Sequence, residues 1–241
     1  MTNSEKVIEW IKKYFKENGN GCKAVIGISG GTDSSVVAAL LVRALGKENV
    51  IGVLMPEGKQ HDIDVSREIV DLLGIKSYTV NIGETVKTLS KEVSEQMGYD
   101  VYQKDIYRTN TPARIRMSVL YGISGLIGGR VVNTCNLSED WVGYSTKFGD
   151  SAGDFSPISA FTKGEVREMG RELGLPRKFV EKIPEDGMSG KSDEEKLGFT
   201  YEVLDRYIRT GEIDDLKIKE KIDHMHKINL HKINPMPAYR K

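Results

Sequence analysis

Short apolar runs alternate with helical patterns along the first third of the chain. Residues 24–28 and 50–55 are apolar runs of the length of a buried strand, and residues 77–80 form a third short strand pattern. Residues 34–45 and 62–73 carry apolar side chains at the spacing of one helix face. This alternation with short connections predicts an α/β fold. We expect a doubly wound parallel sheet with helices on both faces and ligands outside the carboxyl ends of its strands.

The pattern that follows predicts mainly helices. We expect helices at 82–97 and 112–127, with Thr111 as the cap of the second and Pro112 in its first position. Residues 130–134 are predicted as a fourth strand.

Two capping boxes and two polar stretches mark the rest of the chain. Thr162-x-x-Glu165 and Ser192-x-x-Glu195 each predict the start of a helix. Residues 135–159 and 184–195 are too long and too polar to be simple connections, so we predict that they are working loops. The second is similar to a lid that orders over a ligand, and a surface loop without that role is the alternative.

Composition narrows the class of protein. The 241 residues, of which 39% are hydrophobic, suit one domain over residues 1–241. Lys+Arg and Asp+Glu both total 35, so no net charge attracts nucleic acid or an anionic membrane. Residues 1–17 predict an amphipathic helix, not a signal peptide, and no apolar run reaches the roughly 18 residues of a membrane span. Cys22 and Cys135 form no disulfide or metal motif, which favours a cytoplasmic location.

The connection between the first strand and its helix carries the strongest chemical signal. It reads Ser29-Gly30-Gly31-Thr32-Asp33-Ser34. Unpaired N–H groups and the helix dipole attract anions at a helix N-terminus, and glycines allow a phosphate close to the backbone. The segment matches neither the Walker loop nor the dinucleotide fingerprint. It predicts a phosphate site of another type, with a plain strand-to-helix turn as the alternative.

The motif S-G-G-x-D-S resembles the loop of ATP pyrophosphatases, which cleave ATP between its α- and β-phosphates. Four further blocks resemble ammonia-dependent NAD synthetases in order and spacing, at residues 56–62, 110–117, 139–154 and 231–232. The most specific part is Ser145-Thr146-Lys147-Phe148-Gly149-Asp150 together with Asp154. The resemblance implies a Rossmann-like adenine nucleotide α-hydrolase fold. It also implies a homodimeric ligase that makes NAD, AMP and pyrophosphate from deamido-NAD, ATP and ammonia through an acyl-adenylate.

The resemblance also implies roles for individual residues. Asp33 and Glu139 would hold Mg²⁺ and, with Lys163, form the catalytic group; Asp33 could also cap its helix. The ATP contacts would come from the loop and three other places: Gly27, Ile28, Ser29, Gly30, Gly31, Thr32, Asp33, Ser34, Thr134, Lys163 and Glu185. Deamido-NAD would be held by Arg114, Lys147, Asp154, His231 and Lys232.

The sequence departs from the family pattern at two positions. Cys135 stands where relatives often carry Asp, and Glu185 stands where a Ser or Thr hydroxyl usually meets ATP. Because an acid repels a triphosphate, the neighbouring Ser189, Lys191 and Ser192 are alternatives to Glu185.

Rival classes are less compatible with the chain. A thiolating tRNA enzyme would need reactive cysteines and a basic surface, and a GMP synthetase-like enzyme usually carries a glutamine-hydrolysing domain. A nucleotide-binding module without catalysis would keep the phosphate loop and lack the other blocks. Neither cysteine is in a glutaminase-like setting, so free ammonia is the expected nitrogen donor. His224, His226 and His231 have no cysteine or acid at zinc spacing, and no zinc site is expected there.

Overall fold

The computed structural model describes residues 1–59, 63–181 and 192–239. In these residues four strands form the sheet: β1 (Lys23–Gly27), β2 (Val50–Leu54), β3 (Lys76–Thr79) and β4 (Gly129–Val131). The helices are α1 (Asn3–Asn18), α2 (Thr32–Leu45), α3 (Ile63–Leu73), α4 (Gly83–Met97), α5 (Asp105–Ile127), α6 (Leu137–Val142), α7 (Lys163–Glu172), α8 (Arg177–Val180), α9 (Asp193–Leu197), α10 (Tyr201–Thr210) and α11 (Leu216–Ile233). Two short 3-10 helices, η1 (Lys47–Asn49) and η2 (Val101–Gln103), lie in the connections.

The sheet has the order β3-β2-β1-β4, and all of its pairs are parallel. Ala24 of β1 stands opposite Val50 of β2 and Arg130 of β4. The chain moves outward from β1 to β3 and then returns to the other side of β1. The switch point therefore lies between β1 and β4, and open α/β sheets bind their ligands at such a point. The predicted doubly wound parallel sheet is confirmed.

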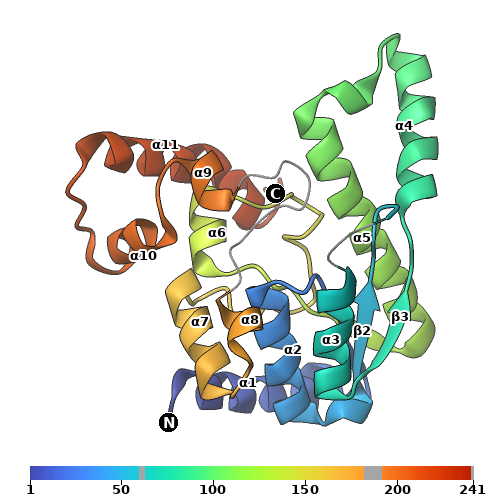
Figure 1. The fold of residues 1–241 in the computed structure, drawn as a ribbon, viewed down its shortest axis with the longest axis vertical. Coiled ribbons are helices and arrows are strands. Elements are labelled where there is room, and N and C mark those ends of the chain that lie inside the picture. The colour runs from blue at the N-terminus through green and yellow to red at the C-terminus, as the bar shows by residue number, and fades with distance from the viewer. Residues whose placement is uncertain (60–62, 182–191, 240–241) are drawn as a thin grey trace.

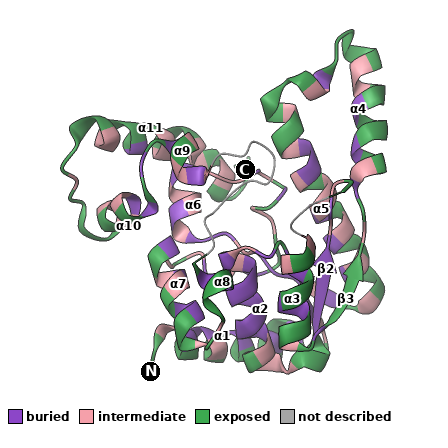
Figure 2. Ribbon diagram, in the orientation of Figure 1, coloured by how far each residue is buried: buried purple, intermediate pink, exposed green. Residues whose placement is uncertain are grey.

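Helices cover both faces of the sheet, because successive strand residues point to opposite faces. Ala24 and Ile26 of β1 belong to the larger core, which α1, α2, α3, α7 and α8 complete. Val25 belongs to a smaller core on the other face, with Met117 and Leu120 of α5. Figure 2 shows α2 largely buried between the other elements, and α4 and α11 largely exposed.

A separate core holds the carboxyl-terminal helices together. It contains buried side chains from α6, α9, α10 and α11, with Tyr201, Leu204 and Ile222 among them. Figure 1 shows these helices as a lobe on one side of the molecule, whereas α4 and the adjoining part of α5 form an arm on the other side. We refer to α6, α9, α10 and α11 as the C-terminal lobe.

Most predicted elements are confirmed to within two residues at each end. They are the first three strands, the amino-terminal helix, and the helices predicted at 34–45, 62–73 and 82–97. Both capping boxes are present, with the Thr162 and Ser192 hydroxyls accepting from the backbone N–H groups of Glu165 and Glu195. None of the described helices is both long and apolar enough to cross a membrane.

The start of α5 was predicted wrongly. The helix begins at Asp105, so Thr111 and Pro112 lie inside it and neither one caps it. A proline inside a helix lacks one backbone donor, but it does not stop a helix that has other support. Here Thr111 and Pro112 are buried, and Asn110 accepts a hydrogen bond from the Thr146 hydroxyl at 2.9 Å. Tertiary packing therefore extends the helix by two turns.

The segment after β4 also differs from the prediction. β4 ends at Val131 and not at Thr134, because Asn133 bonds across to another segment: its backbone N–H donates to Phe155 and its side chain to Asp150. The stretch 135–159 is not a loop throughout, since it contains α6. The Asn136 side chain caps this helix by accepting from the Glu139 N–H at 3.0 Å.

Candidate active site

Hydroxyl groups of the loop between β1 and α2 form hydrogen bonds within the loop. Gly30 has a φ of 75°, and a Cβ there would come within 3.0 Å of the Ser66 backbone nitrogen at the start of α3. The Ser29 and Ser34 hydroxyls lie 2.9 Å apart, and Ser29 Oγ accepts from the Gly31 N–H at 3.2 Å. Gly31 is the N-cap of α2 and supplies no side-chain cap. The first turn of α2 can therefore receive an anion.

Asp33 lies in the first turn of α2 and does not cap it, so the alternative role considered for it was wrong. Its two carboxylate oxygens accept from different elements. Oδ1 accepts from Asn136 Nδ2 at 3.0 Å, and Oδ2 lies 2.5 Å from Lys163 Nζ. Asn136 belongs to the segment after β4, and Asp33 to the segment after β1. Asp33 thus joins the two connections that meet at the switch point of the sheet.

Lys163 brings the second predicted carboxylate into the same group. Its Nζ lies 3.2 Å from Glu139 Oε1 as well as 2.5 Å from Asp33, and the residue is only 2% exposed. The ammonium nitrogen of Lys163 lies over the ring of Tyr201, 5.3 Å from its centroid. We call Asp33, Glu139 and Lys163 the switch-point trio. The three predicted catalytic residues are therefore in direct contact through the Lys163 ammonium group. Asp33 and Glu139 are 106 positions apart in the sequence.

When both acids are ionised, the two carboxylates of the trio share one ammonium, and their combined charge exceeds that of Lys163. Burial lowers the pKa of Lys163, but attraction to Asp33 and Glu139 outweighs burial and raises it overall. Burial raises the pKa of Glu139 to about 8; Lys163 opposes this rise and the Asp33 charge adds to it. Below that pH the Glu139 carboxyl is mostly protonated, and a divalent cation, which favours carboxylate oxygens, would take the place of that proton.

Two carboxylates do not complete the coordination of a metal. Within residues 1–59, 63–181 and 192–239, no group of three or more His, Cys, Asp and Glu side chains could hold an ion. Mg²⁺ commonly takes one or two carboxylates and completes its six ligands with water and substrate phosphates. Asp33 and Glu139 therefore fit Mg²⁺ only together with a phosphate-bearing ligand.

Three of the five residues predicted to bind deamido-NAD lie in one chain of contacts, and Lys232 follows the third in the sequence. Arg114 Nε donates to the Lys147 carbonyl at 3.2 Å, and Lys147 Nζ donates to the His231 carbonyl at 2.5 Å. Lys232 Nζ donates to the Gly143 and Ser145 carbonyls at 2.6 and 3.0 Å. We call Arg114, Lys147, His231 and Lys232 the basic cluster. It joins α5, the segment before residue 150 and the end of α11.

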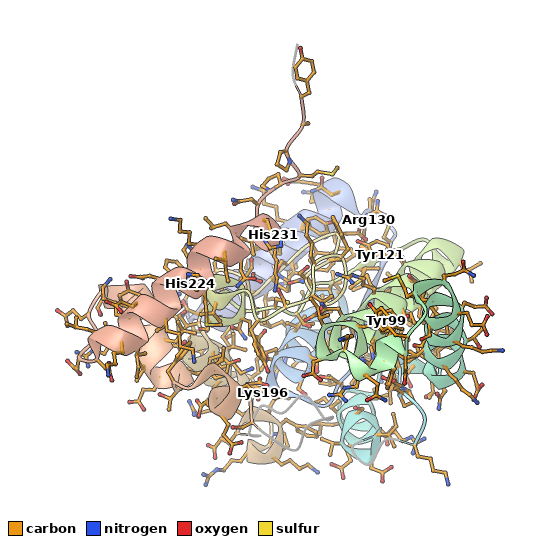
Figure 3. The ribbon with its side chains drawn as sticks, turned by 90° about the horizontal axis from the view of Figure 1, so that it is seen from above. Tyr99, Tyr121, Arg130, Lys196, His224 and His231 are labelled. Carbon is orange, nitrogen blue, oxygen red and sulfur yellow. The ribbon has the colours of Figure 1, made fainter. Side chains whose placement is uncertain are left out.

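The histidines of α11 have different surroundings. Figure 3 shows His231 nearer the middle of the molecule and His224 farther along α11 toward its outer end. His226 stacks on Trp141 with ring centroids 4.3 Å apart, and its Nδ1 lies 2.8 Å from the Trp141 carbonyl. His226 therefore serves to pack α11 against α6.

Asp154 is separate from the basic cluster. Its Oδ2 accepts from the Val131 N–H at 2.7 Å, and its Oδ1 lies 3.4 Å from the Tyr121 hydroxyl. No hydrogen bond or ion pair among the described residues joins it to the other four. Thr134 is half-buried between β4 and α6. Glu185 and two of its alternatives, Ser189 and Lys191, lie outside the described residues.

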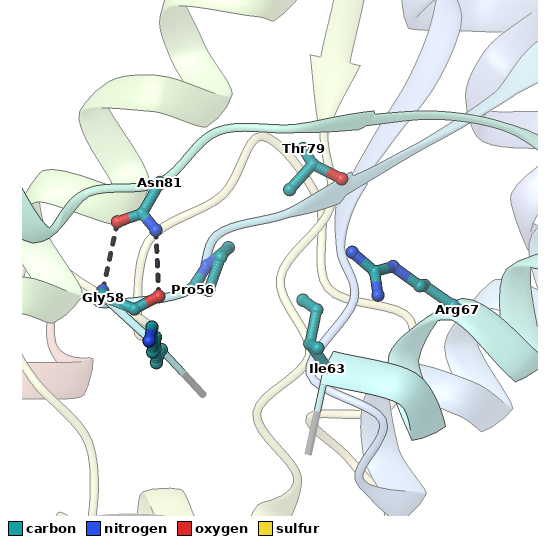
Figure 4. Close-up of a pocket in the computed structure, with 7 residues that line it drawn as sticks. Pro56, Gly58, Ile63, Arg67, Thr79 and Asn81 are labelled. Atoms are coloured by element: carbon teal, nitrogen blue, oxygen red, sulfur yellow. Dashed lines mark hydrogen bonds between the residues drawn. The ribbon is translucent and has the colours of Figure 1, made fainter. Parts of the chain in front are cut away.

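A cavity of about 460 Å³ lies at the carboxyl ends of β2 and β3. Residues after these strands and from α3 line it: Pro56, Gly58, Lys59, Ile63, Arg67, Thr79 and Asn81. Figure 4 shows the Asn81 amide bridging to Gly58, with its Oδ1 accepting from the Gly58 N–H and its Nδ2 donating to the Gly58 carbonyl. The start of α3 also packs against Gly30 of the phosphate loop. The cavity therefore adjoins the loop and has the size of a small-molecule site.

Sequence reasoning missed two residues of this region. Asn136 binds both Asp33 and the N-terminus of α6, and the spacing Asn136-x-x-Glu139 was a visible capping signal. Arg116 donates from Nε to the Met55 carbonyl at 3.1 Å, and burial lowers its pKa. Arg116 lies in the block 110–117 that resembles the family, but nothing in its spacing indicated that it would be half-buried.

A doubly wound sheet with a glycine loop at its switch point defines an α/β nucleotide-binding protein. The family model of NAD synthase matches residues 3–239. The NH(3)-dependent NAD(+) synthetase of Alkaliphilus metalliredigens is 37% identical over 97% of this chain and 96% of its own length. The chain belongs to the NAD synthase family. The predicted family and ligase class are thus confirmed, and neither a GMP synthetase-like enzyme nor a simple binding module is favoured.

Solved structures agree with this assignment. An NMN synthetase from Francisella tularensis matches with a TM-score of 0.89 and 28% identity, covering 99% of this chain and 98% of that one. The NH3-dependent NAD synthetase from Campylobacter jejuni matches with a TM-score of 0.78 and 29% identity, with the same two coverages. The fold of this family thus extends over nearly all of the chain.

Proposed function

We propose that this chain converts deamido-NAD to NAD with ammonia as the nitrogen donor and ATP as the energy source. A nicotinate oxygen attacks the α-phosphorus of ATP, and pyrophosphate leaves. Ammonia then attacks the carboxyl carbon of the acyl-adenylate, loses a proton and displaces AMP. The single observation that best supports this proposal is the contact of Asp33, Glu139 and Lys163 at the switch point, beside the phosphate loop.

We propose that Asp33 and Glu139 hold Mg²⁺ together with phosphate oxygens and water. When bound, Mg²⁺ would neutralise charge on the phosphates during transfer of AMP. Lys163 Nζ bonds both carboxylates, and its ammonium would turn to a phosphate of ATP when the nucleotide binds. The uncapped first turn of α2 would offer N–H donors to another phosphate, and the cavity beside α3 is large enough for part of the nucleotide.

The basic cluster is the proposed site of deamido-NAD. Arg114, Lys147 and Lys232 supply the positive charge that its phosphates and carboxylate need. Their head groups now bind backbone carbonyls, which a phosphate would replace as the acceptor. For Asp154, only the family resemblance supports a role in binding deamido-NAD, because its side chain contacts Val131 and Tyr121 and not the basic cluster.

A second candidate is the amidation of nicotinic acid mononucleotide to NMN. The observation that favours it is the TM-score of 0.89 to a protein described as an NMN synthetase. Both substrates carry the same nicotinate carboxylate and would use the same trio. They differ in the adenylate half, which only the dinucleotide would place against the protein.

We also propose a homodimer formed along α5. A Cβ added at Gly122 or Gly125 would meet nothing within 4 Å, and Leu126 is 88% exposed. Tyr121, on the same part of the helix, is 40% exposed. A second copy could approach this helix closely and bury these side chains.

The test is a product assay with purified protein, ATP, Mg²⁺ and ammonium chloride. Either deamido-NAD or nicotinic acid mononucleotide is added at equal concentration, and NAD, NMN, AMP and pyrophosphate are measured. We expect NAD and AMP in equal amounts, and a higher kcat/KM for the dinucleotide. Preference for the mononucleotide would favour the second candidate. Binding of ATP without AMP formation from either substrate would overturn both.

A further inference from the structure

Helix α10 contacts the segment that carries Lys163 through one side of its surface. Tyr201, Asp205 and Arg209 are spaced by four residues and therefore lie along one face. The Tyr201 ring lies beside Lys163 Nζ, and Arg209 pairs with Glu165 of α7 at 2.5 Å. Between them, Asp205 bonds the Ser138 hydroxyl and the Gly164 N–H, next to the trio. None of the roles predicted from the sequence used this helix.

Asp205 bridges the two helices that carry Glu139 and Lys163. Its Oδ1 accepts from the Ser138 hydroxyl at 2.5 Å, and its Oδ2 accepts from the Gly164 N–H at 2.7 Å. Ser138 Oγ in turn accepts from the Lys163 N–H at 3.0 Å. Ser138 precedes Glu139, and Gly164 follows Lys163. Each oxygen of Asp205 is therefore one residue away from a member of the trio.

The surroundings of this bridge are closely packed. Ser138 is fully buried, and Lys163 is 2% exposed. A Cβ at residue 164 would come within 3.0 Å of Asp205 Oδ2, so glycine allows the carboxylate to approach the start of α7. A negative charge at a helix N-terminus is favourable because of the unpaired N–H groups and the helix dipole. Tyr201 and Leu204, both buried in the core of the C-terminal lobe, hold α10 in place.

We infer that Asp205 is a positioning residue: it fixes Glu139 and Lys163 relative to one another, so that the trio can receive Mg²⁺ and ATP. The inference rests on the proposed roles of the trio. It also assigns a function to the C-terminal lobe. The core of this lobe holds α10 in place, and α10 in turn holds Asp205 against the helices of Glu139 and Lys163. Residues that bond to the ligands of a metal, without contacting the metal, commonly matter for its binding. Their substitution changes metal affinity or activity by about 10- to 100-fold.

The test compares Asp205→Asn with Asp223→Asn. An asparagine has one acceptor oxygen, so Asp205→Asn must leave either Ser138 or Gly164 without its acceptor. Asp223 is a matched control in the same lobe, because it also joins two helices, accepting from Tyr207 at 2.6 Å and from Lys219 at 2.7 Å. It has no contact with Ser138 or Gly164 among the described residues.

The affinity for ATP in the presence of Mg²⁺ is measured by calorimetry, together with the number of sites and the rate of AMP formation. We expect Asp205→Asn to weaken ATP binding at least about 10-fold and to slow AMP formation by a similar factor. The control should stay within twofold for both. A lower number of sites with unchanged affinity would show only partial unfolding, and it would overturn the inference.

Ser138→Ala is a second variant, which removes only a hydroxyl. It tests the inference with a folded protein if Asp205→Asn unfolds. It should also weaken ATP binding. The double variant should bind ATP no more weakly than the weaker-binding single variant, because both substitutions break the same chain of hydrogen bonds. Additive losses would contradict a single positioning chain. If the wild-type protein binds ATP but makes no AMP, the proposed function fails while the affinities still test Asp205.

Discussion

The switch-point trio and the basic cluster are built in opposite ways. In the trio, the charged side chains bond other side chains: Lys163 is buried and bonds both carboxylates, and Asn136 donates to Asp33. In the basic cluster, the charged head groups bind backbone carbonyls, and Arg114 and His231 are exposed. A buried group of charges has its geometry fixed before a ligand arrives, whereas exposed side chains can exchange a carbonyl for a phosphate.

This difference suggests a division of labour. The trio would perform the chemistry that is common to every substrate with a nicotinate carboxylate. The basic cluster would determine which substrate is held there. Substitutions in the trio should therefore lower kcat and the stability of the fold. Substitutions in the basic cluster should lower only the affinity for the substrate.

Asp33→Asn should have the largest effect. The variant keeps a side chain that can bond Asn136, but it removes one of the two proposed Mg²⁺ ligands. Loss of several kcal/mol of charge stabilisation would slow AMP formation by roughly 1,000-fold or more. The measurement is pyrophosphate and AMP release, with thermal melting as a check on the fold. Asp71→Asn, on an exposed position of α3, is the control. Near-normal AMP formation by Asp33→Asn would refute the metal assignment.

Lys163→Met should destabilise the protein in addition to stopping its reaction. It removes the ammonium and leaves two neighbouring carboxylates uncompensated, at a cost of about 3–5 kcal/mol in the free energy of unfolding. Urea denaturation measures this loss. Because a cation can replace the lost charge, millimolar Mg²⁺ should recover part of the stability of the variant and change the wild type less. Equal responses of the two proteins to Mg²⁺ would argue against paired carboxylates as the metal site.

Lys147→Ala should affect substrate affinity alone. Removing one charge-assisted contact of about 2 kcal/mol should raise the KM for deamido-NAD roughly 30-fold, with little change in the KM for ATP. The melting temperature should remain within a few degrees of the wild type. Lys217→Ala on the exposed face of α11 provides a matched control. If kcat fell while the KM for deamido-NAD did not change, Lys147 would belong with the trio.

Leu126→Lys should have the smallest effect on each folded subunit. Leu126 is 88% exposed, so the change costs no core packing, but it would place like charges against each other in the proposed dimer. Light scattering should report a monomer where the wild type is a dimer. A wild-type protein that is monomeric at assay concentration and fully active would remove the basis for the dimer proposal.

The sequence was sufficient for the order of the elements and for the phosphate loop. Apolar runs at 24–28 and 50–55 predicted β1 and β2 because a buried parallel strand needs little more than a continuous apolar segment. The glycines of the loop were informative because Gly30 needs a positive φ and close contact with α3. The assignment of one domain and the cytoplasmic location remain predictions.

Long-range packing could not be predicted from local patterns. Pro112 signalled a helix start, yet packing of the segment around Thr146 against Asn110 carries α5 two turns further back. The roles of Asn136 and Asp205 depend on loops and helices that are distant in the sequence. The pattern Asn136-x-x-Glu139 is typical of a helix start but was not used as a prediction, and only the fold shows that Asn136 also holds Asp33. No local signal linked Asp205 to Ser138 and Gly164.

The most direct test of the central claim is a crystal structure with a non-hydrolysable ATP analogue and Mn²⁺ in place of Mg²⁺, with the metal located by its anomalous signal. We expect one Mn²⁺ bound by Asp33, Glu139 and phosphate oxygens, with Lys163 Nζ moved from the carboxylates to a phosphate. The claim would be contradicted by a structure in which Lys163 still bridges the two carboxylates and the phosphates of the analogue bind to the basic cluster.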